Sequence, residues 1–311
     1  MSGVAPSVRL ARRVRLLCLC AALVTQTSQA HVSLRETPTD ASWNEITVIA
    51  AILLAAVLYG AGLRKVWRKS THARRGAVLR AVAFVSGLAA VSAALLSPLD
   101  RWGAQLFALH MIQHEILMLI AAPLLVWGRP LPLFLWAFGD RSRAAIARLT
   151  QAAPVRAIWT GLLTPVVAWL LHALTLWVWH VPRFFDAVLR NAGLHELQHL
   201  SFLAAALVFW AAMIEARRQE QRGAAILYLF TTTVHTSVLG ALITFAVRPW
   251  YSAYLQMPGH WGLSALEDQQ LGGLIMWVPG SLVYVGIALA LLVYWIRSSD
   301  STRRHPMSPQ L

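Results

Sequence analysis

Residues 271–296 read LGGLIMWVPGSLVYVGIALALLVYWI, an apolar stretch without a charged side chain that ends at Arg297. A helix needs about 20 apolar residues to cross the roughly 30 Å of hydrocarbon in a bilayer, so this stretch predicts a membrane-spanning helix. Six further apolar segments of similar length precede it. We place the seven spans at residues 44–63, 76–97, 103–127, 156–180, 194–215, 223–247 and 271–296.

Every one of these spans should be a helix. Lipid cannot pair free backbone groups, and the sequence has no alternating pattern of a membrane barrel. Pro123, Pro165 and Pro279 lie inside predicted spans, where we expect them to kink the helices. The sequence therefore predicts an all-α fold, a polytopic membrane bundle of seven transmembrane helices that follows an N-terminal signal peptide.

The composition agrees with a membrane protein rather than with a soluble domain. Of 311 residues, 58% are hydrophobic and 13% are charged, whereas soluble domains carry about 25% charged residues. The net charge of +14 could by itself indicate a nucleic-acid partner. The positive residues, however, lie in short clusters between apolar runs, which is typical of anchoring at a membrane surface. We therefore expect membrane lipid, and no nucleic acid, among the partners.

The first 30 residues have the pattern of a signal peptide. A basic region precedes an apolar core from about Val14 to Val24, and Ser28-Gln29-Ala30 provides a small-x-small end. Cleavage after Ala30 would remove Cys18 and Cys20, the only two cysteines. The mature chain would then have no disulfide and no thiol ligand. The alternative is an uncleaved first helix.

Lysine and arginine are distributed unequally between the two ends of the predicted spans. Eighteen lie in the segments 64–80, 128–156, 216–222 and 297–311, and five lie in the segments at the other end. Positive loops stay in the cytoplasm, so the mature N-terminus should face outward and the C-terminus inward. The predicted organisation is a signal peptide at 1–30, an outward-facing segment at 31–43, a membrane domain at 44–297 and a cytoplasmic tail at 298–311.

Histidines inside the spans are the most informative polar residues, because burying them in lipid is costly. Residues 110–115 read HMIQHE and residues 195–199 read HELQH, so both contain the pattern H-x-x-Q-H. The i, i+3, i+4 spacing puts His, Gln and His on one helical face. Both spans should run from outside to inside, which places both motifs in the outer half of the bundle.

Paired histidines one turn apart can chelate a metal ion. With no cysteine in the mature chain, transiently bound copper fits best, ahead of zinc and of haem iron. The predicted metal ligands are His110, Met111, His114, His195, His199 and His235. The alternative is that these histidines hydrogen-bond across helices and hold the bundle together. We expect this second role for His172.

Other polar residues are predicted to orient the ligands or to admit the metal. Glu115 and Glu196 neighbour the histidine pairs and could hold imidazole N–H groups. Glu267 and Asp268 open the last span, where acids also stabilise a helix N-terminus. The full set is Gln113, Glu115, Glu196, Gln198, His180, Met257, His260, Glu267 and Asp268.

The depth of each histidine follows from a rise of about 1.5 Å per residue. His195, His199 and His180 should lie near the outer interface. A helix that starts near Gly103 would put His110 about 10 Å deeper. His114, His172 and His235 should then lie near the middle of the membrane.

Several of these motifs, in this order, resemble the bacterial multi-spanning CtaG family of cytochrome c oxidase assembly factors. The resemblance covers most of residues 44–296. The matching stretches are HMIQHE at 110–115, AAPLL at 121–125, GRPL at 128–131, WVWHVP at 177–182, FDA at 185–187, HELQH at 195–199, DQQLGG at 268–273 and MWVPG at 276–280.

The resemblance implies an accessory membrane protein, not an enzyme, that matures a haem–copper oxidase. The implied step is the delivery or insertion of copper at the buried copper site of the oxidase's catalytic subunit, with a periplasmic copper donor as a further partner. It also implies the bacterial inner membrane as the location. The ligand predictions rest on the residues themselves, not on the resemblance.

Two other functions remain compatible with the sequence. The first is a membrane cytochrome with a bis-histidine haem between the third and fifth spans. The second is a scaffold or transporter in which the histidines are structural or relay protons. We expect His195 and His199 to accept copper near the outer face, His110 and His114 to hold it deeper, and His235 to mark the end of the path.

Overall fold

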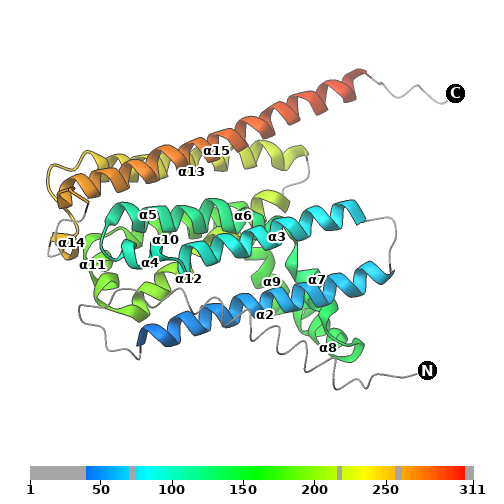
Figure 1. Cartoon of the computed structure of the whole chain (residues 1–311). Helices are drawn as coiled ribbons and strands as arrows, with labels where there is room; N and C mark the ends of the chain where they lie inside the picture. Colours follow the sequence, from blue (N-terminus) through cyan, green and yellow to red (C-terminus); the bar gives the residue numbers. More distant parts are fainter. Residues whose placement is uncertain (1–39, 70–73, 216–218, 256–260, 305–311) are drawn as a thin grey trace. The chain divides into compact units, whose positions relative to one another are not determined.

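A computed structural model describes residues 40–69, 74–215, 219–255 and 261–304 (Figure 1), and within these ranges the regular structure is helical. The predicted signal peptide, Met257 and His260 lie outside the described residues. The elements are α2 (Asp40–Lys69), α3 (Arg74–Leu95), α4 (Pro98–Gly103), α5 (Phe107–Glu115), the π-helix η2 (Ile116–Ala121), α6 (Ala122–Trp127), α7 (Pro130–Ala137), α8 (Asp140–Gln151), α9 (Ala153–Leu162), α10 (Pro165–Trp179), α11 (Pro182–Arg190), α12 (Ala192–Glu215), α13 (Gln219–Thr244), α14 (Ser252–Leu255) and α15 (Ala265–Arg304).

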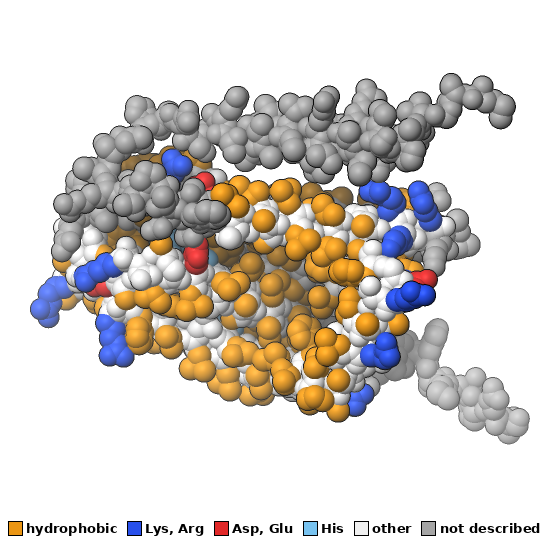
Figure 2. Space-filling model, turned by 90° about the horizontal axis from the view of Figure 1, so that it is seen from below, with side chains coloured by type: hydrophobic (Ala, Val, Ile, Leu, Met, Phe, Trp, Pro, Cys, Tyr) orange, Lys and Arg blue, Asp and Glu red, His pale blue; other side chains and the backbone are white. Residues whose placement is uncertain are grey.

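The prediction of a polytopic helical bundle is confirmed. Among the described residues, six stretches are long and apolar enough to cross a membrane, and a bent helix pair brings the number to seven if the pair counts as one span. Many large hydrophobic side chains on these helices point outward, for example Leu54, Leu200 and Leu282. Figure 2 shows hydrophobic side chains spread across one face, with Lys and Arg gathered toward its two ends. The chain is a multi-pass membrane protein.

The fourth span differs from the continuous helix expected at 156–180. Helices α9 and α10 meet at an angle of 67° across a short break. Pro165 disfavours helical backbone at the residue before it, and Thr164 is indeed extended, with φ −65° and ψ 132°. Proline in the first turn of α10 then costs no hydrogen bond. The break is therefore encoded locally by Thr164-Pro165.

The other two prolines do not break their spans. Pro123 lies in α6, which continues directly from the preceding helical segment, and its missing N–H removes one hydrogen bond to the turn before it. Pro279 lies inside α15, which is continuous from Ala265 to Arg304 and begins earlier than the predicted residue 271.

The third span begins later than predicted and is irregular. Leu106 has extended backbone, with φ −130° and ψ 124°, so α5 begins at Phe107 rather than near Gly103. The Asp268 carboxylate of α15 accepts hydrogen bonds from the Phe107 and Ala108 backbone N–H groups at 2.7 and 3.0 Å. These are N–H groups that a helix cannot pair internally. A carboxylate also complements the positive end of the helix dipole.

A π-helix follows α5 and is stabilised from outside. Residues Ile116–Ala121 form this wider turn, which leaves backbone carbonyls less well paired than in an α-helix. The Trp210 indole of α12 donates to the Met118 carbonyl at 2.8 Å. The contact ties α12 to the third span, with Met118 about one turn after His114 and Trp210 about three turns after His199.

Helices α13 and α15 lie side by side (Figure 1), and small residues bring their backbones together. A Cβ atom built at Gly273 would lie 2.7 Å from the Thr244 nitrogen and 2.8 Å from the Gly240 carbonyl oxygen. Backbone atoms cannot move aside as a flexible side chain can. The glycines therefore set the spacing of this helix pair, as small residues do in membrane bundles.

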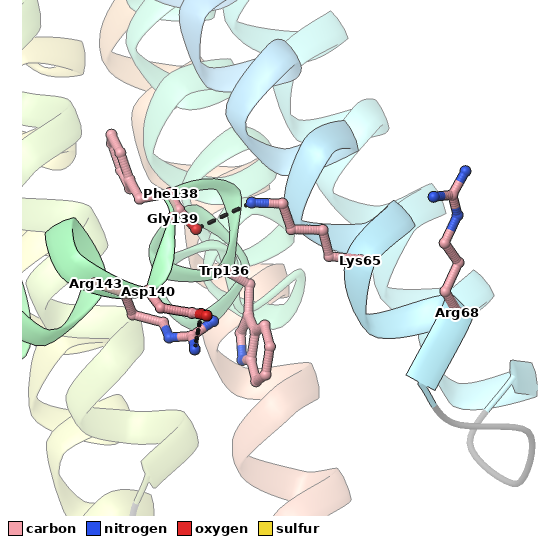
Figure 3. A pocket seen from close by; sticks show the side chains of 7 residues that line it. All are labelled: Lys65, Arg68, Trp136, Phe138, Gly139, Asp140 and Arg143. Atoms are coloured by element: carbon pink, nitrogen blue, oxygen red, sulfur yellow. Dashed lines mark hydrogen bonds and ion pairs between the residues drawn. The ribbon is translucent and has the colours of Figure 1, made fainter.

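A further contact fixes the segment after α7. The Lys65 ammonium of α2 donates to the Ala137 and Phe138 carbonyls at 2.8 and 3.0 Å. These carbonyls end α7, where a cation is favourable. A cavity of about 330 Å³ opens beside this contact (Figure 3). The Arg143 guanidinium beside it bonds Asp140 at 2.6 Å. Lys65 and Arg143 thus bond to acceptors of the protein itself.

We predict that Gly273→Leu lowers the melting temperature in detergent. The added side chain meets backbone atoms of α13, and overpacking of this kind costs about 1–3 kcal/mol or more. A shift of roughly 5 °C should follow, measured by a thermal unfolding assay. Gly286→Leu is the matched control on the same helix, because no heavy atom lies within 4 Å of a Cβ there. Equal shifts in the two variants would contradict the role of Gly273.

We also predict that Asp268→Ala destabilises the protein. It leaves two backbone N–H groups at the start of α5 without partners, which should cost about 2–4 kcal/mol. The melting temperature should fall by roughly 5–10 °C. Glu267→Gln is the control, since Glu267 is exposed and its carboxylate bonds only Ser264 in the contacts described. An unchanged melting temperature for Asp268→Ala would refute the capping role.

Candidate metal centre

The two H-x-x-Q-H motifs converge in space. His110 and His114 come from α5, and His195 and His199 come from α12. Ring centroids lie 5.3 Å apart for His110 and His195, 5.9 Å for His110 and His199, and 5.4 Å for His114 and His199. Within each helix, the two rings lie 4.4 and 4.3 Å apart. We call these residues the four-histidine cluster.

This arrangement corrects the predicted depths. The sequence placed His110 about 10 Å below His195, yet the two rings are neighbours. The reason is the late start of α5: His110 lies in its first turn, not two turns inside a helix that begins at Gly103. His110 and His114 are therefore part of one cluster with the α12 pair rather than a deeper station.

The cluster has dimensions that suit one metal ion. A metal–nitrogen bond of about 2.0 Å puts an imidazole centroid roughly 3 Å from the ion, so tetrahedral ligands have centroids about 5 Å apart. The five centroid distances range from 4.3 to 5.9 Å. One ring nitrogen from each of His110, His195 and His199 lies within 4.8 Å of the other two.

Several imidazole nitrogens in the cluster lack a hydrogen-bond partner. They are His110 Nδ1, His195 Nε2, His199 Nε2 and both nitrogens of His114. An unpaired buried polar atom costs about 1–3 kcal/mol. His110 and His114 are at most 3% exposed, so bulk water does not provide the missing bonds. A bound cation would use these lone pairs.

Gln198 sets the tautomer of His110. Its side-chain oxygen lies 3.2 Å from His110 Nε2, and Gln198 is fully buried. When this oxygen accepts from Nε2–H, Nδ1 carries the lone pair of the ring. This is the arrangement by which an outer hydrogen bond prepares an imidazole for a metal.

The equivalent glutamine of the other motif has a different role. Gln113 donates to the Ala94 carbonyl at 2.9 Å and to the Asp100 carboxylate at 2.7 Å. It ties α5 to α3 and α4. The predicted orienting role thus falls to Gln198, although the two motifs share one spacing.

His180 and Met111 form a second pair of soft donors. His180 Nδ1 lies 2.7 Å from the Leu176 carbonyl, so it carries the proton, and Nε2 faces the Met111 sulfur at 3.5 Å. With the ring proton on Nδ1, Nε2 presents a lone pair toward the sulfur. Met111 sits between His110 and His114 in the chain. Sequence spacing predicted both residues but not this contact.

The four predicted acids lie apart from the imidazole ligands. Glu115 points toward Gly280 of α15, and one of its oxygens has no partner. Glu196 is exposed. Glu267 caps its own helix by accepting from Ser264, and Asp268 caps α5. The helix-terminus role expected for the last two is therefore what the structure shows, with Asp268 serving a different helix from its own.

An aromatic layer, which the sequence analysis missed, covers the cluster. Phe185 packs on His110 at 5.1 Å and on Tyr251 at 4.4 Å. The Tyr251 hydroxyl donates to the His180 carbonyl at 3.3 Å, and the Tyr254 hydroxyl donates to the Gly103 carbonyl at 2.8 Å. These rings shield the buried His110 from water, whereas His195 is partly exposed. The density of Trp, Tyr and Phe in residues 177–185 and 250–254 was the available signal.

The Asp186 carboxylate fastens this layer. It accepts from the Ser252 N–H and hydroxyl at 3.2 and 2.6 Å and from the Ala253 N–H at 3.1 Å. Helix α14 is thereby joined to α11. His235, the remaining predicted ligand, does not join the four-histidine cluster and instead lies beside His172.

The comparisons with known proteins agree with this architecture. Residues 57–298 match the model of the cytochrome c oxidase caa3 assembly factor family, Caa3_CtaG. No solved structure matches the chain. The chain is 28% identical over 256 residues to the uncharacterized proteins Mb0105 of Mycobacterium bovis and MT0111 of Mycobacterium tuberculosis. The alignment covers 80% of this chain and 38% of those proteins, so this chain resembles a part of each. Because the family match extends over most of its length, the chain is a member of the cytochrome c oxidase caa3 assembly factor family.

Proposed function

We propose that this protein binds copper as Cu(I) in the four-histidine cluster and delivers it to the buried copper site of a haem–copper oxidase catalytic subunit. The observation that carries the proposal is the convergence of two H-x-x-Q-H motifs into one buried group of imidazoles with unpaired nitrogens. Family membership supplies the oxidase as the associated complex. The role is accessory rather than catalytic.

Charge favours a monovalent ion. The ligand group holds three imidazoles and no carboxylate, and burying a charge in an apolar bundle is costly unless it is balanced. Cu(I) has half the charge of Zn²⁺ and accepts imidazole and thioether ligands. Beside the cluster, Met111 adds a thioether sulfur and His180 adds an imidazole nitrogen.

Exchange also requires that coordination stays weak. Neutral ligands from different helices, without a thiolate, release Cu(I) more readily than a closed cysteine site would. By the distribution of positive residues, the cluster lies in the outer leaflet of the bacterial inner membrane, with the N-terminus outside and the C-terminus in the cytoplasm. Copper would then arrive from a periplasmic donor.

The geometry favours copper over a bis-histidine haem. Axial ligands of a haem must stand on opposite faces of a macrocycle. Here, four imidazoles pack on one another with centroids 4.3–5.9 Å apart, and Phe185 and Phe202 contact the same rings. A scaffold with structural histidines would not need so many unpaired nitrogens.

We predict that the purified protein binds Cu(I) and that His110/His114/His195/His199→Ala binds one equivalent less. Removing these imidazoles removes the ligand set. Total metal analysis after Cu(I) loading and desalting measures the loss, and the absorption spectrum should contain no Soret band. Glu196→Gln, beside His195 but exposed, should bind as the wild type does. A folded four-alanine variant with unchanged copper would contradict the proposal, and a Soret band would favour the cytochrome.

The same variants test delivery in cells. A deletion strain complemented with the four-alanine variant should accumulate an oxidase that contains haem but has a reduced copper content and a reduced activity. Glu196→Gln should restore both. Normal oxidase copper with the four-alanine variant would show that the cluster is not used for delivery, even if it binds copper in the purified protein.

We further predict that Gln198→Leu weakens Cu(I) affinity about tenfold, because loss of an orienting hydrogen bond typically costs 10–100-fold in metal affinity. Competition with a Cu(I) chelator of known affinity measures the change. The copper equivalents at saturation should not change, since the imidazoles remain. An affinity equal to that of Glu196→Gln would show that Gln198 does not orient His110.

A further inference from the structure

A second pair of histidines lies inside the bundle, apart from the four-histidine cluster. His172 of α10 and His235 of α13 have ring centroids 5.9 Å apart and ring planes at 67°. The Tyr284 hydroxyl of α15 lies 3.2 Å from His172 Nε2. Trp169 packs edge-on against His235 at 5.4 Å. Three helices thus contribute to this deep pair, which sequence spacing could not assemble.

The deep pair is short of hydrogen-bond partners. His172 Nδ1, both nitrogens of His235 and Trp169 Nε1 are buried without one. His172 is 1% exposed and Tyr284 is 2% exposed. When the Tyr284 oxygen accepts from His172 Nε2–H, the lone pair of Nδ1 is left free. Histidines that merely hold helices together would bond across them, and His235 makes no such bond.

The spacing of the rings fits one two-coordinate ion. With metal–nitrogen bonds of about 2.0 Å, two imidazoles on opposite sides of an ion have centroids roughly 6 Å apart. The observed separation is 5.9 Å. Cu(I) accepts low coordination numbers and imidazole ligands, whereas Zn²⁺ requires about four ligands.

Helix α12 gives the distance between the two groups of histidines. Phe202 packs on His114 at 4.4 Å, and Phe209 packs on His172 at 4.8 Å. Seven residues of helix separate these phenylalanines, which corresponds to about 10 Å. The deep pair is therefore about two turns further along the bundle and is connected to the cluster by the apolar face of α12.

We propose that His172 and His235 form a second, two-coordinate Cu(I) site, which takes the ion from the four-histidine cluster and holds it deeper in the bundle. The transfer step rests on the proposed function, whereas the site itself does not. His235 was predicted to end the copper path, and this proposal adds His172 as its partner ligand. His172 was expected to hold helices together, and here it is proposed as a ligand instead.

The test is a Cu(I) titration of the full-length protein in detergent under reducing conditions, with a chromophoric chelator as competitor. The wild type should bind two equivalents. His172→Ala/His235→Ala should bind one, and the four-alanine variant of the cluster should also bind one. X-ray absorption on that four-alanine variant should report about two nitrogen neighbours, as a two-coordinate site requires. Glu196→Gln is the control, because Glu196 is exposed and the variant keeps every imidazole, so it should still bind two equivalents.

Each result decides between the two proposals. We call His172→Ala/His235→Ala the deep double variant. If the wild type and the deep double variant each bind one equivalent of Cu(I), the second site is overturned and the proposed function stands. Two equivalents in the deep double variant also overturn it. If the wild type binds one equivalent, and only the deep double variant loses it, the result supports the second site and contradicts Cu(I) binding by the four-histidine cluster. Because His172 is buried and its double variant could fail to fold, His235→Gln, at a half-buried position, repeats the titration and should also bind one.

Discussion

Hydrocarbon offers no hydrogen bonds, so each polar group inside this bundle must find its partner within the protein. That constraint explains the contacts on which the fold depends. Asp268 of α15 pairs the first N–H groups of α5, Trp210 of α12 pairs a carbonyl of the π-helix, and Gln113 pairs the end of α3. Each contact joins two spans at a point where one of them departs from regular helix. The irregular points of the third span are thus where the bundle is held together.

The same departures create the candidate site. Since α5 starts at Phe107, its first turn brings His110 to the level of His195. The aromatic layer and α14 then close over the histidines, held by Asp186 and by the hydroxyls of Tyr251 and Tyr254. The result is a buried group of neutral nitrogens, with Asp100 as a carboxylate within electrostatic range of His195. These features are the basis of the proposed Cu(I) site.

The unpaired nitrogens support the proposal that the histidines are ligands rather than interhelical contacts. Elsewhere in the described residues, buried polar side chains largely follow the pairing rule: Thr232 and Thr236 bond back to their own helix, and Ser237 bonds Ser281. The exceptions gather at the two histidine groups and at their immediate neighbours. Leaving such atoms unpaired lowers stability, and their concentration in two places about two helical turns apart supports the proposed passage of an ion along α12.

The sequence by itself determined the class of fold, because the length and apolarity of each span are local properties. It also identified the H-x-x-Q-H motifs, since helical spacing puts residues four apart on one face. Pro165 located a kink in the fourth span, but the sequence did not give its angle of 67°. The sequence could not determine the start of α5, which depends on Asp268 some 160 positions away. It did not distinguish Gln198 from Gln113 or join His172 to His235. Those outcomes required the tertiary structure, because they depend on which helices touch and at what height, and no local pattern encodes either.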